Sequence, residues 1–93
     1  MKYNREDLPC IGEQWYHYKH SDDRGVEDHL YTIVALGYGT EDDILYVVYE
    51  PVYISDHLGE HSASVYVRPL DNFLSHVVLE TGEKRKRFVK CTN

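Results

Sequence analysis

The segment VYVRPLDNF, at positions 65–73, decides the fold of this chain more than any other stretch. Its valines face one side of a short strand, while Tyr66 and Arg68 face the other side. Pro69 removes a backbone donor and ends the strand. Residues 69–74 are too few for a stable helix, so we expect one short 3₁₀ turn there.

Further strands are expected on both sides of this segment, wherever short runs are rich in β-branched and aromatic residues. Polar or acidic stretches at 20–28, 40–43 and 54–63 predict loops and turns between them. Residues 81–84, TGEK, predict a hairpin turn. The expected strands cover residues 15–19, 29–38, 44–53, 64–68, 77–80 and 87–90.

This pattern predicts an all-β fold, a small antiparallel SH3-like barrel of five to six strands with one short 3₁₀ turn. Residues 44–53 are apolar on both faces, as in a strand of a closed barrel. Pro51 should bend this strand or make it an edge, where a second copy could pair to form a homodimer. An OB-like barrel is the alternative, but the sequence leaves no room for the helix that it needs.

The length of 93 residues predicts one domain, with an N-terminal arm over 1–13 and the barrel over 14–93. The first residues are polar, and no apolar run approaches the roughly 18–20 residues that span a bilayer, so we expect a cytoplasmic protein without a membrane partner. Cys10 and Cys91 are expected to be reduced in that compartment, although a disulfide between them stays open.

The net charge of −6 argues against non-specific binding to nucleic acids. The basic run at 84–87, KRKR, is the exception. Such a run is usually a solvated hairpin tip, and it would bind nucleic acid weakly and in a salt-dependent manner. Nucleic acid is therefore an unlikely partner on sequence grounds.

Three motifs stand out along the chain: WYHYKH at 15–20, LYVVYEPVY at 45–53 and VYVRPLDNF at 65–73. Together they resemble a small bacterial family known as domain of unknown function 1653, whose members are expected to share this barrel. The chain departs from the family pattern in its longer loops at 20–28 and 54–63, and in Tyr66, which replaces the usual tryptophan. The matching residues include His17, Tyr18, Lys19, Val47, Val48, Tyr49, Tyr53, Val67, Arg68, Pro69, Leu70 and Phe73. The resemblance implies no assigned activity.

A group of aromatic and basic residues forms the candidate ligand-binding site. Aromatic faces stack on planar or apolar ligands, and Arg or Lys pairs with a carboxylate or phosphate. The same rings could instead fill the barrel core. Arg68 likewise has two interpretations: a ligand anchor, or a brace that bonds carbonyls, Glu50 or Asp71. The candidate residues are Trp15, Tyr18, Lys19, Tyr49, Tyr53, Tyr66 and Arg68.

The sequence gives little support for a metal, a cofactor or catalysis. His57 and His61 have the i, i+4 spacing of a zinc pair on a helix, but Gly59 lies between them in a predicted loop. No nucleophile elbow, phosphate-binding glycine loop or catalytic cysteine signature is present. We therefore expect no cofactor and no enzyme activity.

These patterns predict a non-enzymatic binding module with a groove lined by tyrosine and arginine. A protein segment is the first expected partner, bound along the groove as extended peptides are bound by SH3 domains. The alternatives are a small anionic or nucleotide-type ligand, and nucleic acid at the basic C-terminal hairpin.

Overall fold

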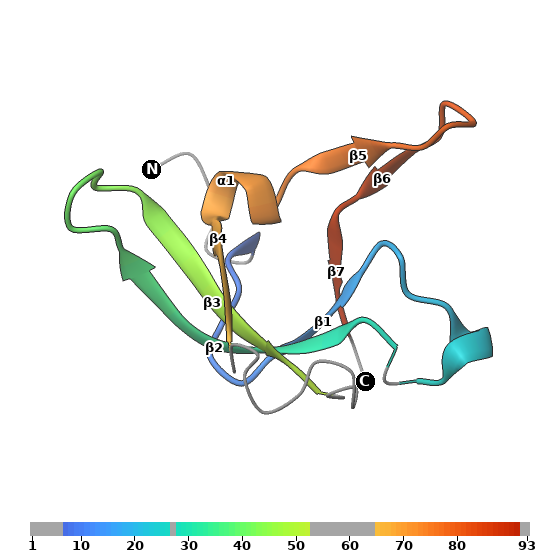
Figure 1. The fold of residues 1–93 in the computed structure, drawn as a ribbon, viewed down its shortest axis with the longest axis horizontal. Helices are drawn as coiled ribbons and strands as arrows, with labels where there is room; N and C mark the ends of the chain where they lie inside the picture. The colour runs from blue at the N-terminus through green and yellow to red at the C-terminus, as the bar shows by residue number, and fades with distance from the viewer. Residues whose placement is uncertain (1–6, 27, 53–64, 92–93) are drawn as a thin grey trace.

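The computed structural model describes residues 7–26, 28–52 and 65–91 (Figure 1). Within them the chain forms seven short strands and two single helical turns. Their order is β1 (Gln14–His17), η2 (Asp22–Arg24), β2 (Leu30–Tyr38), β3 (Leu45–Pro51), β4 (Tyr66–Pro69), α1 (Leu70–Phe73), β5 (His76–Val78), β6 (Lys84–Lys86) and β7 (Phe88–Lys90). The predicted all-β fold is confirmed.

Five of the strands form one antiparallel sheet in the order β4-β3-β2-β1-β7, and β5 pairs with β6 in a separate two-stranded sheet. Figure 1 shows the β5–β6 hairpin extending away from the curved main sheet. Five or six strands were expected because only one strand, 87–90, was predicted after the hairpin turn. The chain instead leaves the small sheet at Arg87, whose N–H donates to Ser75 O and whose carbonyl accepts from Tyr18 N, both at 2.9 Å.

The turn after β4 differs in type from the expectation, and a second helical turn lies where a loop was predicted. Leu74 N donates to Leu70 O at 3.0 Å, an i to i+4 bond, so the turn after β4 is α-helical. The 3₁₀ turn η2 lies inside the stretch predicted as a loop. Ser21 caps η2 because its side chain accepts from Asp23 N.

The core lies on the concave side of the main sheet, beneath α1 (Figure 1). Phe73 from α1 is fully buried, stacks on Phe88 with ring centroids 4.1 Å apart and meets the edge of Trp15 at 5.3 Å. The single helical turn therefore supplies side chains that cover this part of the sheet and complete its core. The buried cluster consists of Trp15, Ile33, Val47, Tyr49, Leu70, Phe73 and Phe88.

The described part of the N-terminal arm lies against the sheet. Leu8 packs on the core, and Pro9 is fully buried. Gly12 N donates to Ile33 O at 2.9 Å, from a φ of +92° that glycine adopts without strain. This contact anchors the chain immediately before β1.

Strand β3 is an interior strand, and Pro51 stands at its end opposite Tyr31. Strand β4 pairs with β3 only from Tyr46 to Tyr49, so Pro51 lies beyond its reach. The two outermost strands of the sheet are β4 and β7, and SH3-like closure between them stays a prediction. Cys10 and Cys91 form no disulfide. Among the described residues, no helix has the length and apolar character to cross a membrane.

Candidate functional site

A pocket of about 380 Å³ opens beside the core, between the ends of the strands of the main sheet. Its described lining includes no residue of α1. Aromatic rings form most of the wall, and two cations, Lys19 and Arg68, contribute the positive charge. The lining residues are His17, Lys19, His29, Tyr31, Tyr49, Tyr66, Val67, Arg68 and Phe88.

Arg68 projects from β4 into this pocket and is half-buried. Its Nε donates to the Tyr49 hydroxyl at 3.1 Å, and Nη1 donates to Asn72 Oδ1 at 2.5 Å. Its guanidinium carbon lies 5.4 Å from the centroid of the Phe88 ring, within cation–π range. These contacts fix the direction of the guanidinium without neutralising its charge.

The prediction that Arg68 bonds to Glu50 or Asp71 is wrong. Glu50 and Asp71 are exposed, and no carboxylate among the described residues forms an ion pair with this guanidinium. Glu50 follows Tyr49 on β3, so alternation along the strand turns its side chain to the opposite face of the sheet. The described part of the pocket therefore keeps an unneutralised cation.

Three tyrosine rings gather in the pocket wall. Tyr31 meets Tyr49 edge-on at 5.3 Å and Tyr66 at 6.1 Å, while Tyr49 and Tyr66 lie 5.8 Å apart. Burial raises the pKa of Tyr31, and the neighbouring phenols of Tyr49 and Tyr66 raise it further. The wall therefore combines ring edges with phenol hydroxyl groups that can donate hydrogen bonds.

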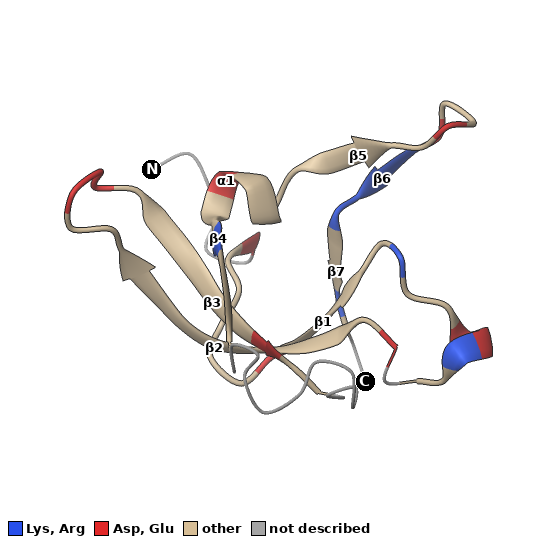
Figure 2. Ribbon diagram, viewed as in Figure 1, with Lys and Arg blue, Asp and Glu red and all other residues tan. Residues whose placement is uncertain are grey.

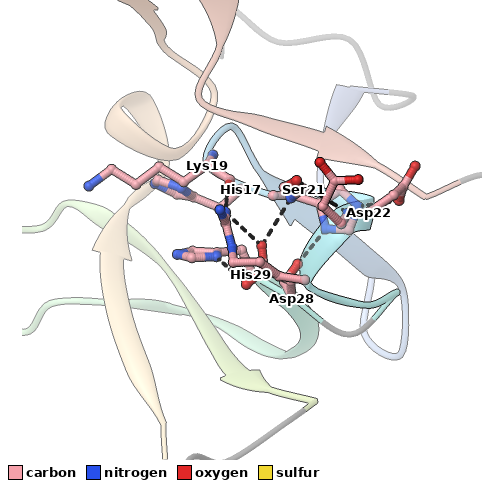
Figure 3. Close-up of polar contacts among 9 residues, drawn as sticks. His17, Lys19, Ser21, Asp22, Asp28 and His29 are labelled. Atoms are coloured by element: carbon pink, nitrogen blue, oxygen red, sulfur yellow. Dashed lines mark hydrogen bonds and ion pairs between the residues drawn. The ribbon is translucent and has the colours of Figure 1, made fainter.

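Two imidazoles form the opposite side of the pocket (Figure 3). The rings of His17 and His29 stack with centroids 5.7 Å apart, and His17 meets the edge of Phe88 at 5.0 Å. The pKa of His17 is lowered to about 4, first by burial, then by its interaction with His29 and by the cations Arg68, Lys19 and Arg87. His17 is therefore neutral near pH 7, inside a pocket of positive potential.

Asp28 holds His29 and the preceding loop in place (Figure 3). Its carboxylate accepts from Ser21 N at 2.9 Å, pairs with Arg24 at 2.9 Å and lies 3.1 Å from Nδ1 of His29. That last contact lacks hydrogen-bond geometry. The Arg24 guanidinium is the main reason that the pKa of Asp28 lies far below its ordinary value. His29, next to this network, has a φ of +50°.

The structure brings together four of the seven predicted site residues, Lys19, Tyr49, Tyr66 and Arg68. Trp15 belongs to the core, where its side chain is only 6% exposed. Tyr53 lies outside the described residues. The pocket residues that the sequence did not select for the site are His17, His29, Tyr31, Val67 and Phe88.

Tyr18 lines a second hollow of about 330 Å³, which shares His17 with the first pocket. This hollow lies beside the basic hairpin, and its lining includes Tyr16, His20, Arg85 and Lys86. Figure 2 shows basic residues along β6 and acidic residues at the tip of the same hairpin. Arg85 pairs with Glu83 at 3.1 Å, which reduces the free positive charge of this surface.

Nothing in the described ranges forms a metal centre, since no three His, Cys, Asp or Glu side chains come together there. His57 and His61, the pair weighed for zinc, lie outside the described residues.

The pocket and its supporting strands lie within one family match. The model of the family described as Protein of unknown function (DUF1653) matches residues 13–90. The chain belongs to this family. The DUF1653 match spans β1 to β7, so it includes every lining residue of the pocket. The family resemblance inferred from the motifs is thereby confirmed, whereas a bacterial source stays a prediction. No curated protein and no solved structure matches the chain.

Proposed function

We propose that this DUF1653 domain is a binding module for a small organic anion, with Arg68 as the anchor of the charged group. The observation that carries the proposal is Arg68, a half-buried residue at the pocket whose guanidinium has no carboxylate partner among the described residues. Desolvating a cation is costly unless an opposite charge arrives, so this position favours an anionic ligand.

The remaining wall fits the body of such a ligand. Arginine presents a planar fork of donors that matches a carboxylate or phosphate, and only two of its five N–H groups are used in the bonds to Tyr49 and Asn72. Lys19 adds a second cation at the rim. Tyr31 and Tyr66 offer ring edges and hydroxyl groups to a planar or apolar body. A volume of about 380 Å³ falls within the usual range of small-molecule pockets.

Isothermal titration calorimetry with phenyl phosphate and benzoate tests this proposal. We expect saturable one-site binding that weakens at least tenfold in Arg68→Ala and less in Arg68→Lys, which keeps the charge but loses the fork. Arg85→Ala is the matched control, because Arg85 is exposed on β6 and does not line this pocket. Equal affinities for Arg68→Ala and Arg85→Ala would overturn the proposal, as would the absence of binding to the wild type.

A protein segment is the second candidate, supported by the outer edge of β4, on which no strand of the described ranges pairs. Val67 on that edge is 59% exposed, and it borders the same pocket. An extended segment could add to the edge as a further strand. A panel of small anions that all fail to bind, together with specific capture of a protein that Val67→Pro abolishes, would favour this candidate over the first.

Two further partners remain proposals of lower rank. A second copy of the chain could pair near Pro51, which sedimentation at several protein concentrations would detect. Nucleic acid could contact the basic residues Lys84 and Lys86, both exposed on β6. Retention on an oligonucleotide column at moderate salt would support that contact.

A further inference from the structure

We propose that His17 is a second anion-binding residue of this pocket, and that it acts as a neutral hydrogen-bond donor through Nε2–H. The inference rests on the proposed function, since it assigns a role to His17 at the site anchored by Arg68. Sequence reasoning did not select His17 for the site.

The tautomer of His17 follows from one contact at the end of β1. Lys19 N lies 3.2 Å from His17 Nδ1 and donates its hydrogen to that atom. A backbone amide can only donate, so Nδ1 must carry a lone pair. The proton of the neutral ring is therefore on Nε2, and the ring has one donor left for another group.

Packing holds the ring in a defined position against the pocket. His29 stacks on it at 5.7 Å, Phe88 meets it edge-on at 5.0 Å, and Tyr18 lies 4.5 Å away. Figure 3 shows the rings of His17 and His29 one above the other, with the Lys19 side chain extending to the same side. A donor whose ring is already fixed loses little conformational entropy when it binds a ligand.

The groups that face His17 keep it neutral. Lys19 follows it on the same turn, Arg68 approaches from β4, and Arg87 from the segment before β7. His29 stacks on it from the segment before β2, with Asp28 behind that ring. The Tyr31 hydroxyl belongs to the same pocket. Burial and these cations lower the pKa of His17 to about 4, so Nε2–H is a neutral donor throughout the physiological range.

This role makes a prediction that separates His17 from an ordinary histidine anion site. A histidine that binds as imidazolium gains affinity for anions as the pH falls through about 6.5. A neutral donor gives no such gain above its lowered pKa. Benzenesulfonate is the suitable probe, because its charge does not change over this range, and we expect its affinity to vary less than threefold between pH 8 and pH 5.5.

Paired substitutions test which ring nitrogen binds. The amide of His17→Gln places a donor near the position of Nε2, whereas His17→Asn reaches only the position of Nδ1. We expect His17→Gln to keep benzenesulfonate affinity within about threefold and His17→Asn to lose at least tenfold. His76→Gln is the control, because His76 is exposed on β5. Equal affinities of the Gln and Asn variants, or a tenfold gain of affinity at pH 5.5, would overturn the inference.

Nitrogen NMR of the imidazole in the ligand-free wild type covers the case in which a variant fails to fold. The Nε2–H tautomer at pH 6.5 is the expected result, and an Nδ1–H tautomer or an imidazolium would overturn the inference. The two proposals can also fail separately. Loss of binding in Arg68→Ala with full binding in His17→Asn refutes only the role of His17, whereas a wild type that binds no anion refutes both.

Discussion

The two ends of the concave face differ in how they are filled, although the same strands build both. At one end α1 inserts Leu70 and Phe73, which are almost completely buried, over the sheet. At the other end no residue of α1 lines the space, and imidazoles, phenols and Arg68 surround a pocket instead. A single helical turn thus decides where the core stops and where the pocket begins.

Tyr49 marks the boundary between the two ends. Its ring is 4% exposed and packs against Phe73 at 5.6 Å, as a core residue does. Its hydroxyl accepts from Arg68 and belongs to the pocket. The core therefore positions Arg68, the proposed anchor. Substitutions at the two ends should differ in their effects on stability and on anion binding.

Truncating Phe73, which α1 inserts into the core, should have the largest effect on stability. Phe73→Ala leaves a cavity between Phe88 and Trp15, and such changes cost about 3–5 kcal/mol of the free energy of unfolding. Urea denaturation measures this loss. Val78→Ala on the exposed β5 is the control and should stay within about 0.5 kcal/mol. A loss below about 1 kcal/mol for Phe73→Ala would show that α1 does not close the core.

Substitution of Tyr49 should have an intermediate effect on both stability and anion affinity. Tyr49→Phe keeps the ring but leaves Arg68 Nε without its acceptor. We expect the free energy of unfolding to fall by roughly 1–2 kcal/mol, which is the lower part of the range for hydrogen bonds to charged groups. Anion affinity should also fall, because the guanidinium loses its fixed direction. Tyr38→Phe, at a ring that is 65% exposed, should change neither quantity.

The pH dependence of stability should report on His17, at the pocket end of the concave face. The folded state lowers the pKa of His17 from 6.5 to about 4, so the unfolded chain binds more protons between these values. This contribution to stability is complete above about pH 6.5 and is lost as the pH falls towards 4. His17→Gln should flatten the melting-temperature curve between pH 7 and pH 4.5, whereas His76→Gln should leave the slope as in the wild type.

The basic hairpin should give the smallest effect, because it belongs to neither end of the face. Lys84 is exposed on β6, away from the pocket lining. Lys84→Ala should change stability by no more than about 0.5 kcal/mol and leave the affinity for benzenesulfonate within twofold. A tenfold loss of affinity in this variant would move the anion site to the hairpin.

Alternation and turn chemistry were enough to predict much of the fold. The β-branched runs predicted β2, β3 and β4, and the period of two placed Tyr66 and Arg68 on one face of β4. The hairpin turn around Gly82 was also predictable, because its φ of +90° suits glycine. Local patterns carry these features, since neighbouring residues alone determine them.

The missed pocket residues depend on contacts between distant segments. His17 lies opposite Phe88 only through the pairing of β1 with β7, and no local pattern sets that register. His29 is placed by the ion pair of Asp28 with Arg24 in a segment predicted only as a loop. Tyr31 gave one usable signal, its alternation with the buried Ile33 on β2. Trp15 was misassigned because its ring suits a core as well as a ligand.

The most direct measurement is the NMR signal of the Arg68 Nε–H group while phenyl phosphate is added. If the open end of the concave face is an anion pocket, this signal should shift and saturate together with those of the Tyr31 and Tyr66 rings, and the amides of β6 should stay unchanged. Shifts that never saturate, or that centre on Lys84–Lys86 and leave the Arg68 signal in place, would contradict the account.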